Sequence, residues 1–342
     1  MGDSKLGRRL VGAMLIGVLV YGAFVAYRGA DKIGAKLTTF AWSTFAIACG
    51  LSFVNYLLRF LKWEYYLRLL GIRDVPKPTS FFTFLSGFVL TVTPGKVGEV
   101  FKSVILQQVR GVPVERTAPI VVAERVTDLI GVITLIAVGS FSFPGGVVWA
   151  SSGMLLVLAI LVMVGSPRAS DWVIAGLPKL PGVLGRVGGR IGAKMTEAFS
   201  RLRAITEPKH LVVPTLLSIV GWGLEGVGLW IILGGFDEHP PLTVTAFCYA
   251  TATLAGALIP VPGGLGVTDK LLEEQMARLG GVQATTATSA MLLARFATLW
   301  FAVIVGFVAL AILRSMYPSL RPSAQASPAS PPRESVDNQG AT

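Results

Sequence analysis

Two breaks rich in proline and glycine bring charged side chains into otherwise apolar stretches of the sequence. Proline and glycine interrupt helices and free backbone N–H and C=O groups, which hydrocarbon cannot satisfy. A membrane protein tolerates such a break where it is buried in protein or lines a wet cavity. We therefore interpret the two breaks as the polar centre of the chain. The helix-breaking residues are Pro94, Gly95 and Gly98 in the first break, and Pro262, Gly263, Gly264 and Gly266 in the second.

Three charged residues at the first break could bind an anion. A helix starting after Pro94 would point unpaired N–H groups and its positive dipole end at the break, and Lys96 adds a charge there. A phosphate or carboxylate could be held by these groups. Glu99 would stabilise the helix start, and Lys102 follows one turn later. The alternative is a local Glu99–Lys102 pair that only caps the helix. We favour binding, because charges inside membrane segments are costly and usually functional.

The segment from Glu124 to Asp128 is a second candidate. If its helix begins near Val114, Arg125 lies about 16 Å along it, close to the membrane midplane. Arg125 and Asp128 are three residues apart and can pair, while Glu124 and Asp128 share a face. Two acids there need another cation, for which we expect Arg295. The alternative is a structural ion network that locks the helices together.

Two further acids complete the predicted binding residues. Glu225 stands alone among the glycines of 221–228. Close helix packing explains the glycines, whereas the acid could carry a proton or pair with a cation. Asp269 follows the second break. The full predicted set is Lys96, Glu99, Lys102, Glu124, Arg125, Asp128, Glu225, Asp269 and Arg295.

The composition indicates an integral membrane protein. Of 342 residues, 53% are hydrophobic and only 14% are charged, and several apolar runs exceed the ~18 residues that a bilayer requires. The net charge of +11 lies mostly in segments between these runs, as the positive-inside rule predicts, so nucleic acid is not an expected partner. Neither cysteines nor histidines have metal-ligand spacing, and no nucleotide or nucleophile motif occurs. We therefore expect no enzyme activity, no cofactor and no metal.

The apolar runs predict an all-α membrane domain over 1–316 with about six transmembrane helices. The predicted spans are 10–27, 37–58, 114–139, 147–165, 211–234 and 282–313. Residues 59–77 would form a basic loop, and 168–210 a basic amphipathic segment on the cytoplasmic side. The stretches 79–109 and 242–279 are each interrupted by a break and would form re-entrant helical hairpins, although the second is long enough that a full crossing stays open. The Pro- and Ser-rich tail 317–342 is predicted to be disordered.

Charge and repetition predict an inverted repeat. If the hairpins do not cross, both termini and most basic loops are cytoplasmic. Three crossings then separate the hairpins, so they enter from opposite faces. The pattern Pro94-Gly95-x-x-Gly98 matches Pro262-Gly263-x-x-Gly266. Inverted repeats of broken helices are how many transporters build a site at the membrane midplane.

Three motifs together resemble the lysylphosphatidylglycerol synthase transmembrane-region family. They are Thr93-Pro-Gly-Lys-Val-Gly-Glu99, Glu124-Arg-Val-Thr-Asp128 and Val261-Pro-Gly-Gly-Leu-Gly-Val267. The resemblance covers about residues 5–315 and implies a bacterial or archaeal inner-membrane protein related to flippases of aminoacylated phosphatidylglycerol. Two positions depart from the family pattern: Lys96 stands where we expect Arg, and Asp269 where we expect a nearby Glu. No soluble aminoacyl-transferase domain follows the sixth span, so synthase activity is not implied.

Our hypothesis from the sequence is a flippase that moves a phospholipid or lipid-linked headgroup through a polar cavity at the midplane. Its expected partners are membrane lipids, anionic phospholipid above all. One alternative is a membrane scaffold that partners a lipid-modifying enzyme or glycosyltransferase, and another is a small-solute carrier.

Overall fold

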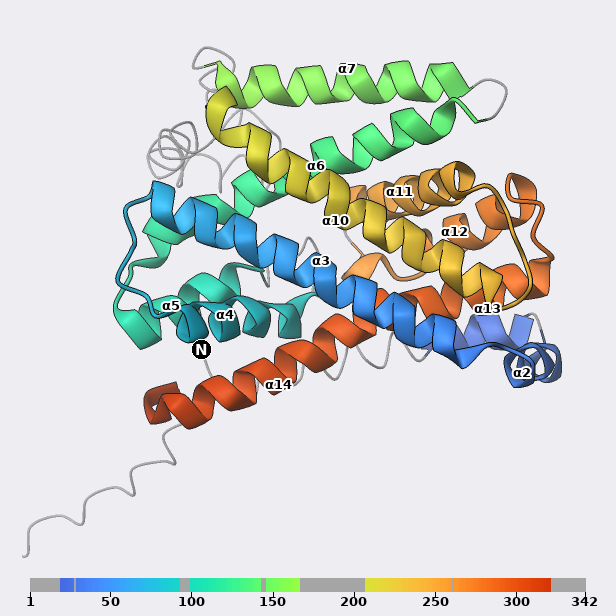
Figure 1. Cartoon of the computed structure of the whole chain (residues 1–342), viewed down its shortest axis with the longest axis horizontal. Coiled ribbons are helices and arrows are strands. Elements are labelled where there is room, and N and C mark those ends of the chain that lie inside the picture. Colours follow the sequence, from blue (N-terminus) through green and yellow to red (C-terminus); the bar gives the residue numbers. More distant parts are fainter. Residues whose placement is uncertain are drawn as a thin grey trace, which may run out of the picture.

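The computed structural model describes residues 19–27, 29–92, 99–142, 146–166, 207–259 and 261–320 (Figure 1). Every regular element in these ranges is helical. The first is the helical segment 19–27. It is followed by α2 (Ala30–Thr38), α3 (Trp42–Leu69), α4 (Lys77–Ser86) with the 3₁₀ turn η1 (Gly87–Leu90), α5 (Phe101–Arg110), α6 (Val114–Ser140), α7 (Gly146–Gly165), α10 (Pro208–Gly234), α11 (Leu242–Leu258), η4 (Pro262–Gly264), α12 (Val267–Arg278), α13 (Ala284–Arg295), the π-helical turn η5 (Phe296–Trp300), α14 (Phe301–Met316) and η6 (Pro318–Leu320).

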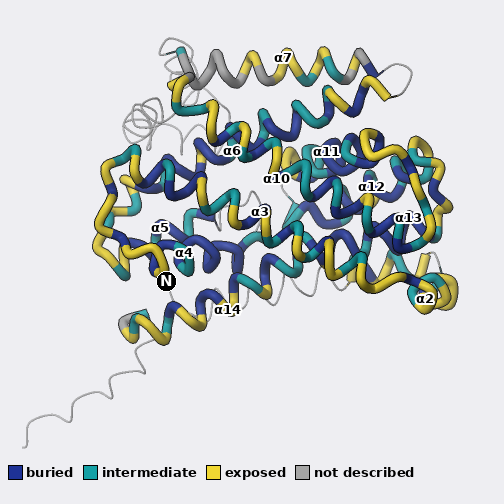
Figure 2. Tube along the Cα trace, in the orientation of Figure 1, coloured by how far each residue is buried: buried dark blue, intermediate teal, exposed yellow. Residues whose placement is uncertain are grey.

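Three of the described helices are long and apolar enough to cross a membrane. They are Trp42–Leu69, Lys209–Gly234 and the continuous stretch Ala284–Met316. Helices α6 and α7 coincide with the predicted spans 114–139 and 147–165. Residues 10–18 of the first predicted span lie outside the described residues. Apolar side chains are exposed along the outer helices, for example Leu155 and Leu158 of α7, as a hydrocarbon environment allows (Figure 2).

The predicted end of the second span at Leu58 is wrong. Helix α3 continues through the expected basic loop to Leu69. The reason is that Lys62 and Glu64 are buried and find partners inside the protein: Lys62 pairs with Asp128, and Glu64 with Lys77. Because these charged residues are paired inside the protein, they do not need water, and the helix can continue through them.

Helices α3 and α10 are antiparallel neighbours across the middle of the molecule (Figure 1). Gly228 faces Ala48, Gly221 faces Asn55, and His210 hydrogen-bonds Tyr65 at 3.2 Å. The residue numbers of the contacts thus decrease along α10 as they increase along α3, so the two helices run antiparallel. A Cβ on Gly221 would lie 2.4 Å from Oδ1 of Asn55, so this glycine permits the close approach.

The two long helices open two segments with the same order of elements. In each, a seven-residue loop (70–76 and 235–241) ends in a proline, and a short helix, a break and another short helix follow. A tight turn with a left-handed glycine then leads into a long helix: Gly111 (φ 70°) before α6 and Gly281 (φ 68°) before α13. The short helices α4 and α5 have ten residues each, about 15 Å, half the ~30 Å hydrocarbon core.

Each hairpin packs against the long helix that closes the other segment. Helix α4 and η1 lie on α14, while α11 lies on α6. Glycines allow both contacts: a Cβ on Gly306 would lie 2.6 Å from the backbone nitrogen of Val89, and one on Gly139 would lie 2.7 Å from the carbonyl oxygen of Thr243. The two segments therefore interlock.

Two predicted segments are only partly described. Residues 168–206 of the basic segment lie outside the described residues, and α10 already begins at Pro208. The tail was predicted to be disordered from residue 317. Instead, Tyr317 hydrogen-bonds Thr79 at 2.9 Å. Tyr317 and Leu320 both pack on buried apolar residues at the end of α14, which explains why the ordered part extends past residue 317. Residues from 321 onward lie outside the described residues.

Candidate functional site

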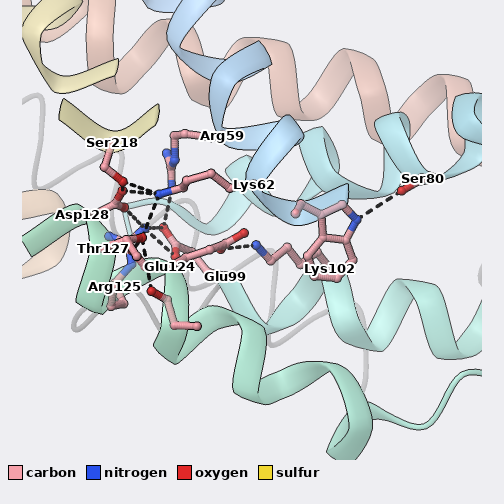
Figure 3. Close-up of polar contacts among 12 residues, drawn as sticks. Arg59, Lys62, Ser80, Glu99, Lys102, Glu124, Arg125, Thr127, Asp128 and Ser218 are labelled. Atoms are coloured by element: carbon pink, nitrogen blue, oxygen red, sulfur yellow. Dashed lines mark hydrogen bonds and ion pairs between the residues drawn. The ribbon is translucent and has the colours of Figure 1, made fainter. Parts of the chain in front are cut away.

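Glu99 and Asp128 are the acidic centres of a buried ion network beside the first break (Figure 3). Glu99 accepts from Arg59 of α3 at 3.2 Å and from Arg125 of α6 at 2.9 Å. Asp128 lies 3.1 Å from Arg125 and 2.5 Å from Lys62 of α3. The predicted Arg125–Asp128 pair is thus present, and the network joins the first hairpin to α3 and α6.

Lys62 ties this network to the second segment. Its ammonium group donates to Ser218 of α10 at 2.7 Å, and Ser218 in turn donates to Asp128 at 2.9 Å. Lys62 is 1% exposed. Since an ammonium group isolated from water needs its donors satisfied, the network fixes how α3, α6 and α10 meet.

Lys102 and Glu124 form a second buried pair in the same region, with Nζ and Oε2 2.5 Å apart. The ammonium group also lies 4.6 Å from the centre of the Trp63 ring and 5.0 Å from that of Phe84. The Trp63 indole N–H donates to Ser80 (Figure 3). Lys102 is therefore enclosed by aromatic rings and a carboxylate, which stabilise its charge inside the protein.

The prediction that Arg295 neutralises Glu124 and Asp128 is wrong. Arg295 instead pairs with Asp269, Nε to Oδ1 at 2.8 Å, and donates to the carbonyl oxygen of Gly263 at 2.5 Å. Asp269 also accepts the backbone N–H of Gly266 at 2.7 Å and so caps α12. Lys62 and Lys102 are the cations that the acids of α6 use, and a single sequence could not show that these lysines reach α6.

The two ion sites have the same construction. In each, an acid at the start of the helix after a break pairs with an arginine of the following long helix. Glu99 and Arg125 are 26 residues apart, as are Asp269 and Arg295. The pairs thus join the residues that follow each break to the long helices in the same manner.

Glu225 lies between these two ion sites and is 4% exposed. Asn55 donates to it at 2.8 Å and Ser52 at 3.1 Å, and the hydroxyl of Tyr249 lies 3.5 Å away. All of these partners are neutral. The other acids of the two ion sites have a basic partner, so Glu225 differs from them in kind.

A cavity lies where the two segments meet. Arg59 and Asn55 of α3, Glu225 of α10, Arg295 of α13 and Gly263 of the second break all line it. The π-helical turn after Arg295 contributes as well: Thr298 and Leu299 line the cavity, and the carbonyl oxygen of Thr298 accepts from Tyr56 at 3.0 Å. Its volume is about 90 Å³, room for several waters but far below the roughly 300–1,000 Å³ of a typical ligand site.

The structure places the predicted residues unequally. Glu225 and Arg295 line the cavity, whereas Glu99, Asp269 and Arg125 support it through ion pairs. Glu124 and Lys102 are occupied with each other. Pro94, Gly95, Lys96 and Gly98 lie outside the described residues. Among residues that the sequence reasoning missed, Arg59 and Lys62 matter most, and one signal could have found them: the apolar run continues past both, through Phe60, Leu61 and Trp63.

The apolar helices and the buried charge network define the class of protein: a helical membrane protein with several apolar spans. The family assignment follows from comparison, since residues 10–306 match the family described as the lysylphosphatidylglycerol synthase TM region. The chain belongs to this family. It is similar to a UPF0104 membrane protein of the archaeon Methanothermobacter thermautotrophicus, with 24% identity over 319 residues, covering 87% of this chain and 93% of that protein. A second UPF0104 membrane protein of the same organism is 22% identical over 283 residues, covering 73% and 77% of the two chains.

Proposed function

We propose that this protein is a lipid translocase that moves a phospholipid or lipid-linked headgroup across the membrane by alternating access. The observation that carries the proposal is the cavity lined by Arg59, Glu225 and Arg295 at the junction of the two segments. Charged side chains inside a membrane domain are costly and mark substrate or ion paths. The chain belongs to a family named for a lipid-modifying synthase, which supports a lipid as the substrate.

The two arginines suit a phosphate. Guanidinium groups bind phosphate through paired, charge-assisted hydrogen bonds. In the structure Arg59 pairs with Glu99 and Arg295 with Asp269. A headgroup phosphate entering the cavity would exchange with these carboxylates, and both acids belong to helices that start at a break. Substrate binding would thereby loosen the breaks from the rest of the protein.

The construction of the two segments supports alternating access. Their elements follow in the same order, and their opening helices α3 and α10 are antiparallel. The hairpin of each segment packs on the long helix that closes the other segment. We interpret this as an inverted repeat with two re-entrant hairpins of opposite insertion, a construction that lets one half rock against the other around a fixed site. The small cavity volume then corresponds to a closed intermediate, and opening requires the hairpins to separate from α6 and α14.

Reconstitution tests the proposal. The full chain is placed in proteoliposomes with acyl-labelled fluorescent phosphatidylglycerol, and outer-leaflet label is quenched with a membrane-impermeant reductant. Wild type should move label between leaflets. The variant Glu225→Gln should move it about tenfold more slowly. The substitution removes the charge of a carboxylate that lines the cavity, and a hydrogen bond to a charged group contributes ~1.5–3 kcal/mol.

Glu274→Gln is the matched control. Glu274 is an acid of α12 that is 41% exposed and pairs with Arg278 away from the cavity, so its variant should match wild type. Folded wild-type protein that moves no lipid would overturn the proposal. In that event, a co-purifying lipid-modifying enzyme would establish a scaffold, and solute uptake by sealed vesicles a small-solute carrier.

A further inference from the structure

A basic groove lies at the end of α3, away from the central cavity. Two adjoining hollows of about 380 and 320 Å³ meet at Ile72, Arg73 and Val75, and each is large enough for a ligand group. The five basic residues of the groove are Arg68, Arg73, Lys77, Arg110 and Arg116, and its acids are Glu64 and Asp74. Glu64 is already bound by Lys77 and Ser80.

The arginines of the groove keep their charge available. Arg110 donates to the carbonyl oxygen of Asp74 at 2.6 Å, and Arg116 to that of Leu70 at 2.8 Å. These bonds to backbone hold two guanidinium groups in place without neutralising them. The guanidinium groups of Arg68 and Arg73 have no hydrogen bond or ion pair within the described ranges. An arrangement of fixed and unpaired guanidinium groups suits a phosphate.

The second segment provides an internal control, because the fold puts an equivalent residue at each of the five positions. The equivalents of Arg68, Arg73, Lys77, Arg110 and Arg116, counted from the same helix ends and glycine turns, are Leu233, Glu238, Leu242, Gly280 and Thr286. None of them is basic. The loops 235–241 and 279–283 contain no Lys or Arg, and the first of them contains two acids. The fold therefore does not require cations in this place.

The surface of α3 beside the groove indicates that the phosphate belongs to a lipid. Val54, Leu57 and Leu61 are exposed apolar residues at helical spacing, and Arg68 follows Leu61 by two turns on the same face. An acyl chain can lie along this stripe while its headgroup reaches the groove. A soluble anion would have no use for the apolar stripe.

We propose that the groove around Arg73 and Arg110 binds the phosphate headgroup of an anionic membrane lipid, at a site separate from the central cavity. Basic pockets between helices at a membrane surface are suited to anionic headgroups. The site does not depend on the proposed translocation, since binding is measured without transport.

Native mass spectrometry of the full, delipidated chain tests this site with phosphatidylglycerol, zwitterionic phosphatidylcholine and inorganic phosphate as probes. Wild type should bind phosphatidylglycerol more tightly than phosphatidylcholine. The double variant Arg73→Gln/Arg110→Gln should bind phosphatidylglycerol about tenfold more weakly or worse. The control Lys32→Gln/Arg278→Gln removes two exposed charges elsewhere and should behave as wild type.

The thermal unfolding temperature of each variant checks that it is folded. Equal phosphatidylglycerol affinity of wild type and the double groove variant would overturn the proposal, as would an equal loss in the control. Binding of inorganic phosphate that depends on Arg73 and Arg110, without binding of phosphatidylglycerol, would show a free-anion site and overturn the lipid assignment.

Discussion

Asp269 joins the second break to the rest of the protein through a single carboxylate, which contacts Arg295 at 2.8 Å and the Gly266 N–H at 2.7 Å. Both oxygens are thus used, one to neutralise a buried arginine and the other to start α12. Glu99 has the corresponding position at the first break, with Arg125 as its partner. These two acids thus join the residues that follow each break to an arginine of a long helix.

Replacing Asp269 should destabilise the protein strongly. Asp269→Asn leaves the Arg295 guanidinium buried without a counter-charge, and removing one member of such a pair costs about 3–5 kcal/mol. We expect this loss in the free energy of unfolding of the detergent-purified protein. The exposed pair Glu274–Arg278 on the same helix supplies the control, since Glu274→Gln should change stability by less than ~0.5 kcal/mol. Similar unfolding of both variants would contradict the assigned role.

Lys62 and Asp128 should be strongly coupled. A double-mutant cycle with Lys62→Met and Asp128→Asn measures the interaction apart from the effect of each residue alone, and we expect about 1.5–3 kcal/mol for this buried, charge-assisted contact. A cycle on Arg278 and Glu274 should give less than ~1 kcal/mol. A coupling below ~0.5 kcal/mol for the buried pair would show that Arg125 alone satisfies Asp128.

The packing of each hairpin on the closing helix of the other segment should depend on two glycines. Gly306→Ala places a Cβ 2.6 Å from the Val89 nitrogen, and Gly139→Ala places one 2.7 Å from the Thr243 carbonyl oxygen. Because backbone cannot yield cheaply, each substitution should lower stability by about 1–3 kcal/mol. Gly50→Ala, where nothing lies within 4 Å, should be neutral or slightly stabilising. Thermal unfolding of the three variants compares them directly, and equal effects would contradict the close packing.

An inverted repeat places equivalent loops on opposite faces of the membrane. Asp74 and His239 hold equivalent, exposed positions in the loops 70–76 and 235–241. With Cys49 and Cys248 replaced by alanine, we expect Asp74→Cys and His239→Cys to react with an impermeant maleimide from opposite sides of intact membranes. The positive-inside rule further predicts that position 74 is cytoplasmic. Labelling of both from one side would end the inverted-repeat interpretation.

The sequence by itself determined the membrane class, the family and most helix positions. These follow from local properties, namely the length of apolar runs and the breaks made by proline and glycine. The spans near 114–139, 211–234 and 282–313 agree with the helices. The pairs Glu99–Arg125 and Asp269–Arg295 consist of residues that stand out as charges inside apolar surroundings, whereas Arg59 and Lys62 do not.

Only the tertiary structure decided which charges meet. The sequence suggested that Arg295 neutralises the acids of α6, but Lys62 and Lys102 do so, because α3 extends beyond its predicted end and carries Lys62 onto α6. Pairing depends on how helices far apart in the chain approach one another, and an apolar pattern reports only which face is buried. The packing of each hairpin on the other segment, and the basic groove at the end of α3, likewise depend on contacts between helices far apart in the chain, which no single segment encodes.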